Sequence, residues 1–310
     1  TGVYLNNMGN GSGASARSGA KITGITVGNM LADGISLSSS RNNTLSGNTT
    51  LANTGTGIYI NSSANNNVTG NITQGNLASG IRVGNASDNN TFTGNTIQGN
   101  ATGIDTTSDN STFTGNTLQG NTVGMNSSFG DTNTITGNTF LSNTNYAIRL
   151  NGSTTNNTIT GNTFTGSTYG VSLDMSTGNT IAANIFKGNS FGIYLPASST
   201  YNMISGNNIQ TSPNGGIVIA SASTNNTITG NKLHDNGGAT FNSAIQIIGS
   251  DSNIITSNSI TDTSATTSNY AISITGGSAT SYLADNTLGT GSINDAGTGT
   301  IFGGQVNVSG

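Results

Sequence analysis

The segment Asn156-Asn157-Thr158-Ile159-Thr160-Gly161-Asn162-Thr163-Phe164 decides the fold of this 310-residue chain. Two short runs, 158–160 and 163–165, alternate polar with aliphatic or aromatic residues, and a Gly-Asn pair separates them. Alternation with period two over so few residues predicts strands rather than a helix. A third run, Gly170-Val171-Ser172-Leu173, follows before the pattern begins again.

The same unit recurs along nearly the whole chain. The asparagine of the Gly-Asn pair, or its equivalent, falls at Asn48, Asn71, Asn95, Asn116, Asn138, Asn162, Asn184, Asn207, Asn231, Asn258 and Asn286. A second marker keeps the same register, namely Gly or Ala before two alternating aliphatic residues, as in Gly57-Ile58-Tyr59-Ile60 and Ala244-Ile245-Gln246-Ile247. A repeat of about 23 residues with three strands predicts a stacked all-β solenoid. Because parallel crossovers are right-handed, we expect a right-handed parallel β-helix of about 12 coils.

The repeat also predicts which side chains fill the interior and which form the corners. One interior stack contains Phe92, Phe113, Ile135, Ile159, Ile181, Ile204 and Ile228, and a second contains Ile97, Leu118, Phe140, Phe164, Phe186, Ile209 and Leu233. Asparagines recur at three corner positions of each coil. At a strand spacing of about 4.8 Å, each side-chain amide can bond to the amide on the next rung. Asn also tolerates the left-handed backbone that tight corners require.

The composition restricts the classes of function. The chain has 7 Lys and Arg residues and 11 acidic residues, all of them Asp, and it contains no Cys. The lack of Cys excludes disulfides, thiolate metal sites and Cys nucleophiles. A net charge of −4 argues against a nucleic-acid partner, and no stretch is apolar enough to insert into a membrane. The chain begins at Thr1, so we expect a processed product located outside the cell or on its surface.

The repeat resembles that of the pectin-lyase-like superfamily of right-handed parallel β-helix proteins, over nearly the whole chain. Members of that superfamily include polysaccharide lyases and hydrolases, uronan epimerases, periplasmic copper-maturation proteins, phage tailspikes and surface proteins. The resemblance implies the fold, and a fold alone does not select among these functions. The Asp-Pro-His motif that an epimerase resemblance would require is absent.

Five residues are weak candidates for catalysis. Lys232, His234 and Asp235 lie together in the sequence, and His234 is the single histidine of the chain. Lys187 occupies the same outward position as His234 two coils earlier, about 10 Å away by stacking. Arg149 is an outward cation that could bind an acidic sugar. The competing interpretation for all five is an ordinary solvated surface, because a lyase needs a placed base beside cations and a hydrolase needs paired carboxylates.

Two outward pairs or rows carry charge without an obvious catalytic role. Arg82 and Asp105 take matching positions on adjacent coils next to Tyr59, which predicts a surface ion pair with cation–π character. Asp88, Asp109 and Asp131 each precede the Gly-Asn asparagine of their coil by seven residues and should stack on successive rungs. Like charges at strand spacing repel, so we predict either a bound hard cation such as Ca²⁺ or an exposed corner where the carboxylates separate in water.

A row of threonines continues the position of the aspartates, at Thr155, Thr177, Thr200 and Thr224. A flat threonine array raises the hypothesis of ice binding. That function requires long outward Thr-x-Thr ranks, and this row is short, so the sequence does not favour it.

The sequence therefore predicts one β-helix domain over 1–310, with a loop excursion at 6–20 and longer coils with loop insertions over 232–300. We expect an extracellular structural or surface protein, a filament-forming or adhesive subunit whose copies associate end to end. The main alternative is a protein that binds or degrades polysaccharide, with a lyase-like or epimerase-like member as one form. A periplasmic accessory protein for metal-centre assembly is a further alternative, which the scarcity of His, Met and Cys disfavours.

Overall fold

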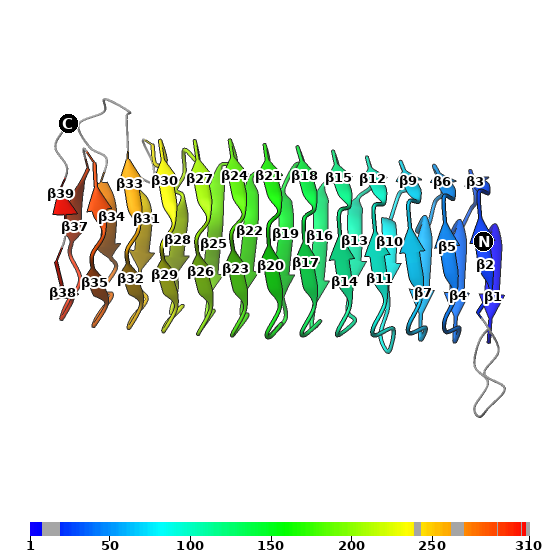
Figure 1. Cartoon of the computed structure of the whole chain (residues 1–310), viewed down its shortest axis with the longest axis horizontal. Helices are drawn as coiled ribbons and strands as arrows, with labels where there is room; N and C mark the ends of the chain where they lie inside the picture. The colour runs from blue at the N-terminus through cyan, green and yellow to red at the C-terminus, as the bar shows by residue number, and fades with distance from the viewer. Residues whose placement is uncertain (8–18, 239–242, 262–269, 290, 305, 308–310) are drawn as a thin grey trace. The chain divides into compact units, whose positions relative to one another are not determined.

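A computed structural model of the chain describes residues 1–7, 19–238, 243–261, 270–289, 291–304 and 306–307. The described residues form short strands joined by tight turns, and no helix occurs among them. Three parallel sheets, here called A, B and C, take one strand each from every coil (Figure 1). The chain divides into two compact units, Thr1–Ile148 (unit 1) and Arg149–Gly310 (unit 2), and the predicted single domain stays a prediction.

In unit 1 each sheet is built from every third strand. Sheet A contains β1 (Val3–Asn6), β4 (Ile35–Ser38), β7 (Ile58–Asn61), β10 (Ser79–Val83), β13 (Thr102–Thr106) and β16 (Val123–Ser128). Sheet B contains β2 (Lys21–Thr23), β5 (Thr44–Ser46), β8 (Asn67–Thr69), β11 (Thr91–Thr93), β14 (Thr112–Thr114) and β17 (Thr134–Thr136). Sheet C contains β3 (Thr26–Gly28), β6 (Thr49–Leu51), β9 (Ile72–Gln74), β12 (Thr96–Gln98), β15 (Thr117–Gln119) and β18 (Thr139–Leu141).

Unit 2 repeats the arrangement, and β19 (Tyr146–Asn151) contains the boundary between the units. Its sheet A has β22 (Tyr169–Asp174), β25 (Phe191–Ala197), β28 (Ile217–Ala220), β31 (Ser243–Ile248), β34 (Tyr270–Thr275) and β37 (Ser292–Asp295). Sheet B has β20 (Thr158–Thr160), β23 (Thr180–Ala182), β26 (Met203–Ser205), β29 (Thr227–Thr229), β32 (Ile254–Thr256), β35 (Tyr282–Ala284) and β38 (Ile301–Phe302). Sheet C has β21 (Thr163–Thr165), β24 (Ile185–Lys187), β27 (Asn208–Gln210), β30 (Lys232–His234), β33 (Ser259–Thr261), β36 (Thr287–Leu288) and β39 (Val306–Asn307).

The predicted interior stacks are confirmed. Phe92 lies on Phe113 with ring centroids 4.7 Å apart, and Phe164 lies on Phe186 at 4.6 Å. All four rings are essentially inaccessible to solvent. The core is therefore a continuous column of apolar side chains in each unit, and the outward residues of each strand are free to vary.

The asparagine ladders are also confirmed. In a typical rung, the Nδ2 and the backbone N–H of Asn48 both donate to Oδ1 of Asn71, each at 2.9–3.0 Å. Nδ2 of Asn71 then donates to Asn95 and to a backbone carbonyl of the previous coil. The ladder asparagines are almost completely buried, so they satisfy corner groups that water cannot reach.

We expected the ladder asparagine itself to adopt the left-handed backbone conformation at these corners. In the structure the residue before it does so instead. Gly47 and Gly70 precede ladder asparagines with φ of 62° and 61°, and Asn42 and Asn65 do so at 59° and 57°. A side chain in the left-handed region is costly for most residues, which explains why Gly and Asn recur there. The ladder asparagine itself contributes hydrogen bonds.

The loop excursion at 6–20 and the insertions within 232–300 fall mainly on 8–18, 239–242 and 262–269, outside the described residues. No helix in the described part of the chain is long and apolar enough to cross a membrane.

Candidate functional site

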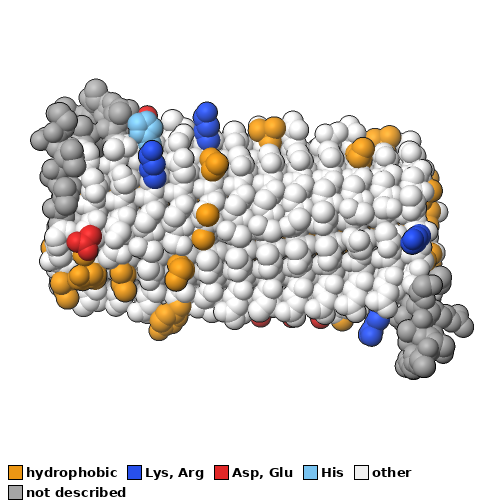
Figure 2. All heavy atoms as spheres, in the orientation of Figure 1, with side chains coloured by type: hydrophobic (Ala, Val, Ile, Leu, Met, Phe, Trp, Pro, Cys, Tyr) orange, Lys and Arg blue, Asp and Glu red, His pale blue; other side chains and the backbone are white. Residues whose placement is uncertain are grey.

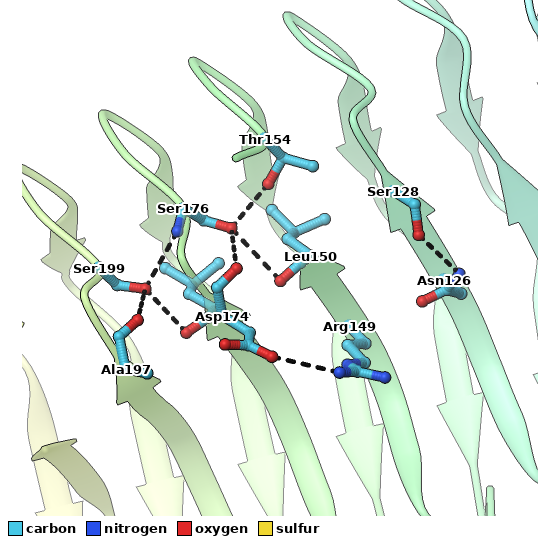
Figure 3. Close-up of polar contacts among 10 residues, drawn as sticks. Asn126, Ser128, Arg149, Leu150, Thr154, Asp174, Ser176, Ala197 and Ser199 are labelled. Atoms are coloured by element: carbon cyan, nitrogen blue, oxygen red, sulfur yellow. Dashed lines mark hydrogen bonds and ion pairs between the residues drawn. The ribbon is translucent and has the colours of Figure 1, made fainter. Parts of the chain in front are cut away.

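The outer face of sheet A carries charged and aromatic side chains. In unit 2 these include an ion pair. The Arg149 guanidinium lies 3.2 Å from Oδ2 of Asp174 (Figure 3). Their side chains are 36% and 22% exposed, so both charged groups contact solvent as well as each other. Ser172, the other outward residue near the end of β22, is buried and small.

A serine ladder fixes the corner where Asp174 ends its strand. Ser176 Oγ donates to the Asp174 carbonyl at 3.0 Å, and Ser199 Oγ does the same for the Ala197 carbonyl at 3.2 Å (Figure 3). The rungs are joined because the backbone N–H of Ser176 donates to Ser199 Oγ at 3.2 Å. Residues of the ladder are buried, so the Asp174 carboxylate projects from a rigid base.

Three aromatic rings form a cluster on β22 and β25 of the same sheet. Tyr169 stacks on Phe191 at 5.1 Å and on Tyr194 at 5.3 Å, and Phe191 contacts Tyr194 at 5.2 Å. Tyr194 pairs in register with Ser172, which lies two residues before Asp174. The two tyrosines are half-buried, whereas Phe191 is 8% exposed. We call Arg149, Tyr169, Asp174, Phe191 and Tyr194 the sheet A site.

Unit 1 presents a related row on its own sheet A. Tyr59, Arg82 and Asp105 pair in register on consecutive strands, as predicted. The Arg82 guanidinium carbon lies 5.5 Å from the Tyr59 ring centre, and Nε lies 3.7 Å from Oδ2 of Asp105. Nδ2 of Asn126 donates to the other Asp105 oxygen at 3.0 Å. The row is polar, with Arg82 exposed and the other residues half-buried, and it contains a single aromatic ring, Tyr59.

The candidates near the histidine occupy sheet C of unit 2. Lys187, Gln210 and His234 are in register on β24, β27 and β30, as predicted. His234 Nε2 lies 3.0 Å from Oδ2 of Asp235, and Nδ1 lies 3.1 Å from the Thr261 hydroxyl. Lys232 is exposed on the same strand. Since Gln210 separates Lys187 from His234, the structure brings His234 and Asp235 together but does not join Lys187 to them, and a catalytic role for these residues stays a prediction.

The aspartate row of unit 1 stacks as predicted, and its carboxylates have backbone partners. Oδ1 of Asp88 accepts from the Asp109 amide at 2.9 Å, and Oδ1 of Asp109 accepts from the Asp131 amide at 2.8 Å. The Asp88 and Asp109 carboxylates thus each hold the backbone of the next rung, which offsets the repulsion between the stacked charges. Among the described residues, no group of three or more His, Cys, Asp or Glu side chains is placed to hold a metal ion. Ca²⁺ binding at this row stays a prediction.

The sequence reasoning missed the sheet A site, although two signals for it are present. Tyr169 and Phe191 both stand directly before the glycine of the second repeat marker, on successive coils. At that glycine the strict alternation of inward and outward residues is interrupted. The two rings therefore point outward, at a position where the alternation predicts an inward side chain. The partner of Arg149, Asp174, lies two residues beyond Ser172 on β22, so the two charged residues do not occupy equivalent positions of the repeat.

Comparison with known proteins places the chain in a family. The family described as "Right handed beta helix region" matches residues 1–164 and 123–288, and the chain belongs to it. Its structure is similar to a mutant of the periplasmic alginate epimerase AlgG, at 12% identity over 89% of this chain and 75% of that one, with a TM-score of 0.60. A second AlgG structure has 14% identity, covers 90% and 76%, and has a TM-score of 0.54. The DFA-IIIase from Arthrobacter chlorophenolicus A6 without its lid has 15% identity, covers 86% and 70%, and has a TM-score of 0.53.

A search of curated proteins gave no match. The family match and the structural likenesses confirm the predicted right-handed parallel β-helix fold.

Proposed function

We propose that this chain binds a polysaccharide through the sheet A site of unit 2. The observation that carries the proposal is the stack of Tyr169, Phe191 and Tyr194 on the sheet that also carries the Arg149–Asp174 pair. Aromatic faces bind the apolar faces of sugar rings, and the tyrosine hydroxyls add polar contacts at the rim. The guanidinium supplies fork-like donors and the carboxylate supplies acceptors for sugar hydroxyls.

The fold suits this role because the site residues sit on strands rather than on loops. Each strand is locked to its neighbours by backbone pairing, and the serine ladder holds the end of β22. Rigid elements keep the side chains in place, so little ordering cost is added on binding. The same regularity supports a repeating ligand, since coils repeat along the sheet as sugars repeat along a chain.

The names of the similar structures support a carbohydrate as the class of ligand. AlgG is named for its action on alginate, and a DFA-IIIase structure contains DFA-III. The proposal for this chain is binding without a defined reaction. Its site has one carboxylate paired to a guanidinium, whereas hydrolysis of a glycoside requires two carboxylates flanking the bond.

The filament-forming or adhesive role, end-to-end association of copies and an extracellular or cell-surface location stay predictions. A polysaccharide-binding surface is compatible with each of them, because polysaccharides coat cells. Sedimentation of the purified chain at several concentrations measures the association directly.

Affinity gel electrophoresis with a panel of neutral and acidic polysaccharides tests the proposal. Tyr194→Ala should weaken the interaction with the retarding polymer about fivefold to thirtyfold, equivalent to about 1–2 kcal/mol. Tyr282→Ala is the matched control, because Tyr282 is an exposed tyrosine of the same unit on sheet B. The proposal fails if no polymer retards the wild type, or if the two variants bind equally well.

A further inference from the structure

Sheet B of unit 1 presents a regular surface that the proposed function does not use. The outward residues of β5, β8, β11, β14 and β17 form two parallel ranks in unbroken register. One rank contains Thr44, Asn67, Thr91, Thr112 and Thr134, and the other contains Ser46, Thr69, Thr93, Thr114 and Thr136. Three of these strands, β11, β14 and β17, carry Thr-x-Thr, whereas β5 carries Thr44-x-Ser46 and β8 carries Asn67-x-Thr69.

The ranks form a regular array made mainly of threonine hydroxyl and methyl groups. Successive strands lie about 4.8 Å apart, and the two ranks are separated by two residues, about 6.6 Å along each strand. Figure 1 shows these strands side by side in nearly the same direction. Threonine is β-branched, which restricts the rotamers of eight of the ten side chains in the two ranks. The Thr114 hydroxyl, for example, lies 3.3 Å from the Thr136 carbonyl, along the rank.

Ladders on both sides hold this lattice rigid. On one side Nδ2 of Asn95 donates to Asn116, and Nδ2 of Asn116 donates to Asn138, each at 2.9 Å. On the other side the Ser111 amide donates to Asn133 at 2.8 Å. A surface fixed before binding loses little entropy when it orders a ligand or water.

The charge pattern selects an uncharged ligand. None of the ten outward residues in the two ranks is ionisable or aromatic, and Figure 2 shows a broad area of this face without charged or hydrophobic side chains. The corner before the ranks carries Asp88, Asp109 and Asp131, which repel polyanions. Protein partners prefer aromatic and Arg-rich faces, and single sugar chains prefer aromatic platforms. The ligand that remains to match the two ranks is one with a large, neutral and periodic surface of its own.

We propose that the two threonine ranks of sheet B in unit 1 bind the surface of ice. Water oxygens on ice surfaces lie in rows whose repeats resemble those of the ranks, so ordered water held by the hydroxyls and surrounding the methyls can merge with the crystal. Water that bridges two partners is nearly as favourable as a direct hydrogen bond. The occupant is therefore a hydrated crystal face rather than a macromolecule.

Ice-affinity partitioning and ice-recrystallisation assays test this inference on the full chain. The wild type should enter growing ice and inhibit recrystallisation, and Thr112→Lys should raise the inhibitory concentration about tenfold, or about 1.4 kcal/mol. Gln119→Lys is the matched control, since it adds the same charge to an exposed position of the same coil on sheet C. Thr112→Val, which keeps the shape and removes the hydroxyl, guards against misfolding and should give an intermediate loss.

Circular dichroism melting confirms that each variant is folded before it is scored. Exclusion of the wild type from ice would overturn the inference, as would equal activity of Thr112→Lys and Gln119→Lys. Binding of the wild type to insoluble neutral polysaccharide, lost in Thr112→Lys while ice is ignored, would also overturn it in favour of that ligand. Because the sheet A site is unchanged in these variants, failure here is separable from failure of the proposed function.

Discussion

Replacing Asn184 by Leu tests how far the asparagine ladders stabilise the fold. Oδ1 of Asn184 accepts from the backbone amide and from Nδ2 of Asn162, at 2.9 and 3.1 Å. Its Nδ2 donates to the Ile159 carbonyl at 2.9 Å and to Oδ1 of Asn207 at 3.0 Å. The amide is thus fully hydrogen-bonded in a position that is 1% exposed. Leu has nearly the same shape and makes none of these bonds.

The expected loss of stability follows from the hydrogen bonds of Asn184 that Leu cannot make. The buried Asn162 amide loses its acceptor, at a cost of about 1–3 kcal/mol, and the three other bonds each contribute about 0.5–1.5 kcal/mol. Asn184→Leu should therefore lower the free energy of unfolding by about 2.5–7.5 kcal/mol. Urea denaturation gives this difference, and hydrogen exchange should place the loss in the neighbouring coils, because a solenoid unit contacts mainly its neighbours.

The control for this prediction is Asn208→Leu. Asn208 faces outward on β27, and the bond its Oδ1 accepts from Gln210 is to another surface side chain. Its replacement should change the free energy of unfolding by no more than about 0.5 kcal/mol. Equal losses for the two variants, or a loss below about 1 kcal/mol for Asn184→Leu, would refute the structural role of the ladder.

Three further changes have defined outcomes. Phe164→Ala should cost about 3–5 kcal/mol in urea denaturation, since it empties a fully buried site and removes the stacked partner of Phe186, whereas Thr165→Ala on the same strand should cost less than about 0.5 kcal/mol. Asp109→Asn keeps the Oδ1 acceptor of its rung, so its melting temperature in metal-free buffer should match that of the wild type; a calcium site would appear as a rise in melting temperature with Ca²⁺ in the wild type and not in the variant. His234→Gln keeps a polar side chain on an exposed strand and should leave polysaccharide retardation unchanged, and a loss of binding would move the site to sheet C.

The fold was predictable because one physical demand recurs in every coil. A residue such as Ile159 must face the interior while its threonine neighbours face out, and the corner after it needs Gly161 before Asn162. The strand pattern, interior stacks and ladders all follow from that repetition. The segments 239–242 and 262–269 interrupt it, and their composition contains no period from which a structure could be predicted.

The candidate site was less predictable because it depends on departures from the repeat. The Phe191 ring points outward at a position where the alternation predicts an inward side chain. It is covered by Tyr169 of β22 and by Tyr194 of its own strand, β25. The Arg149–Asp174 pair is diagonal, so a comparison of equivalent positions does not reveal it. The threonine ranks follow from the repeat, because their residues flank the interior stack of Phe92, Phe113 and Ile135, and the strand pairing confirms their register.

Hydroxyl-radical footprinting with and without a retarding polysaccharide tests the central claim most directly, because it reports the accessibility of individual side chains. We expect Tyr169 and Tyr194 to be protected from oxidation when the polysaccharide is bound, while the exposed Tyr282 on sheet B reacts at the same rate in both samples. Protection of Tyr282 with no change at Tyr169 and Tyr194 would contradict the assignment of the binding surface to sheet A.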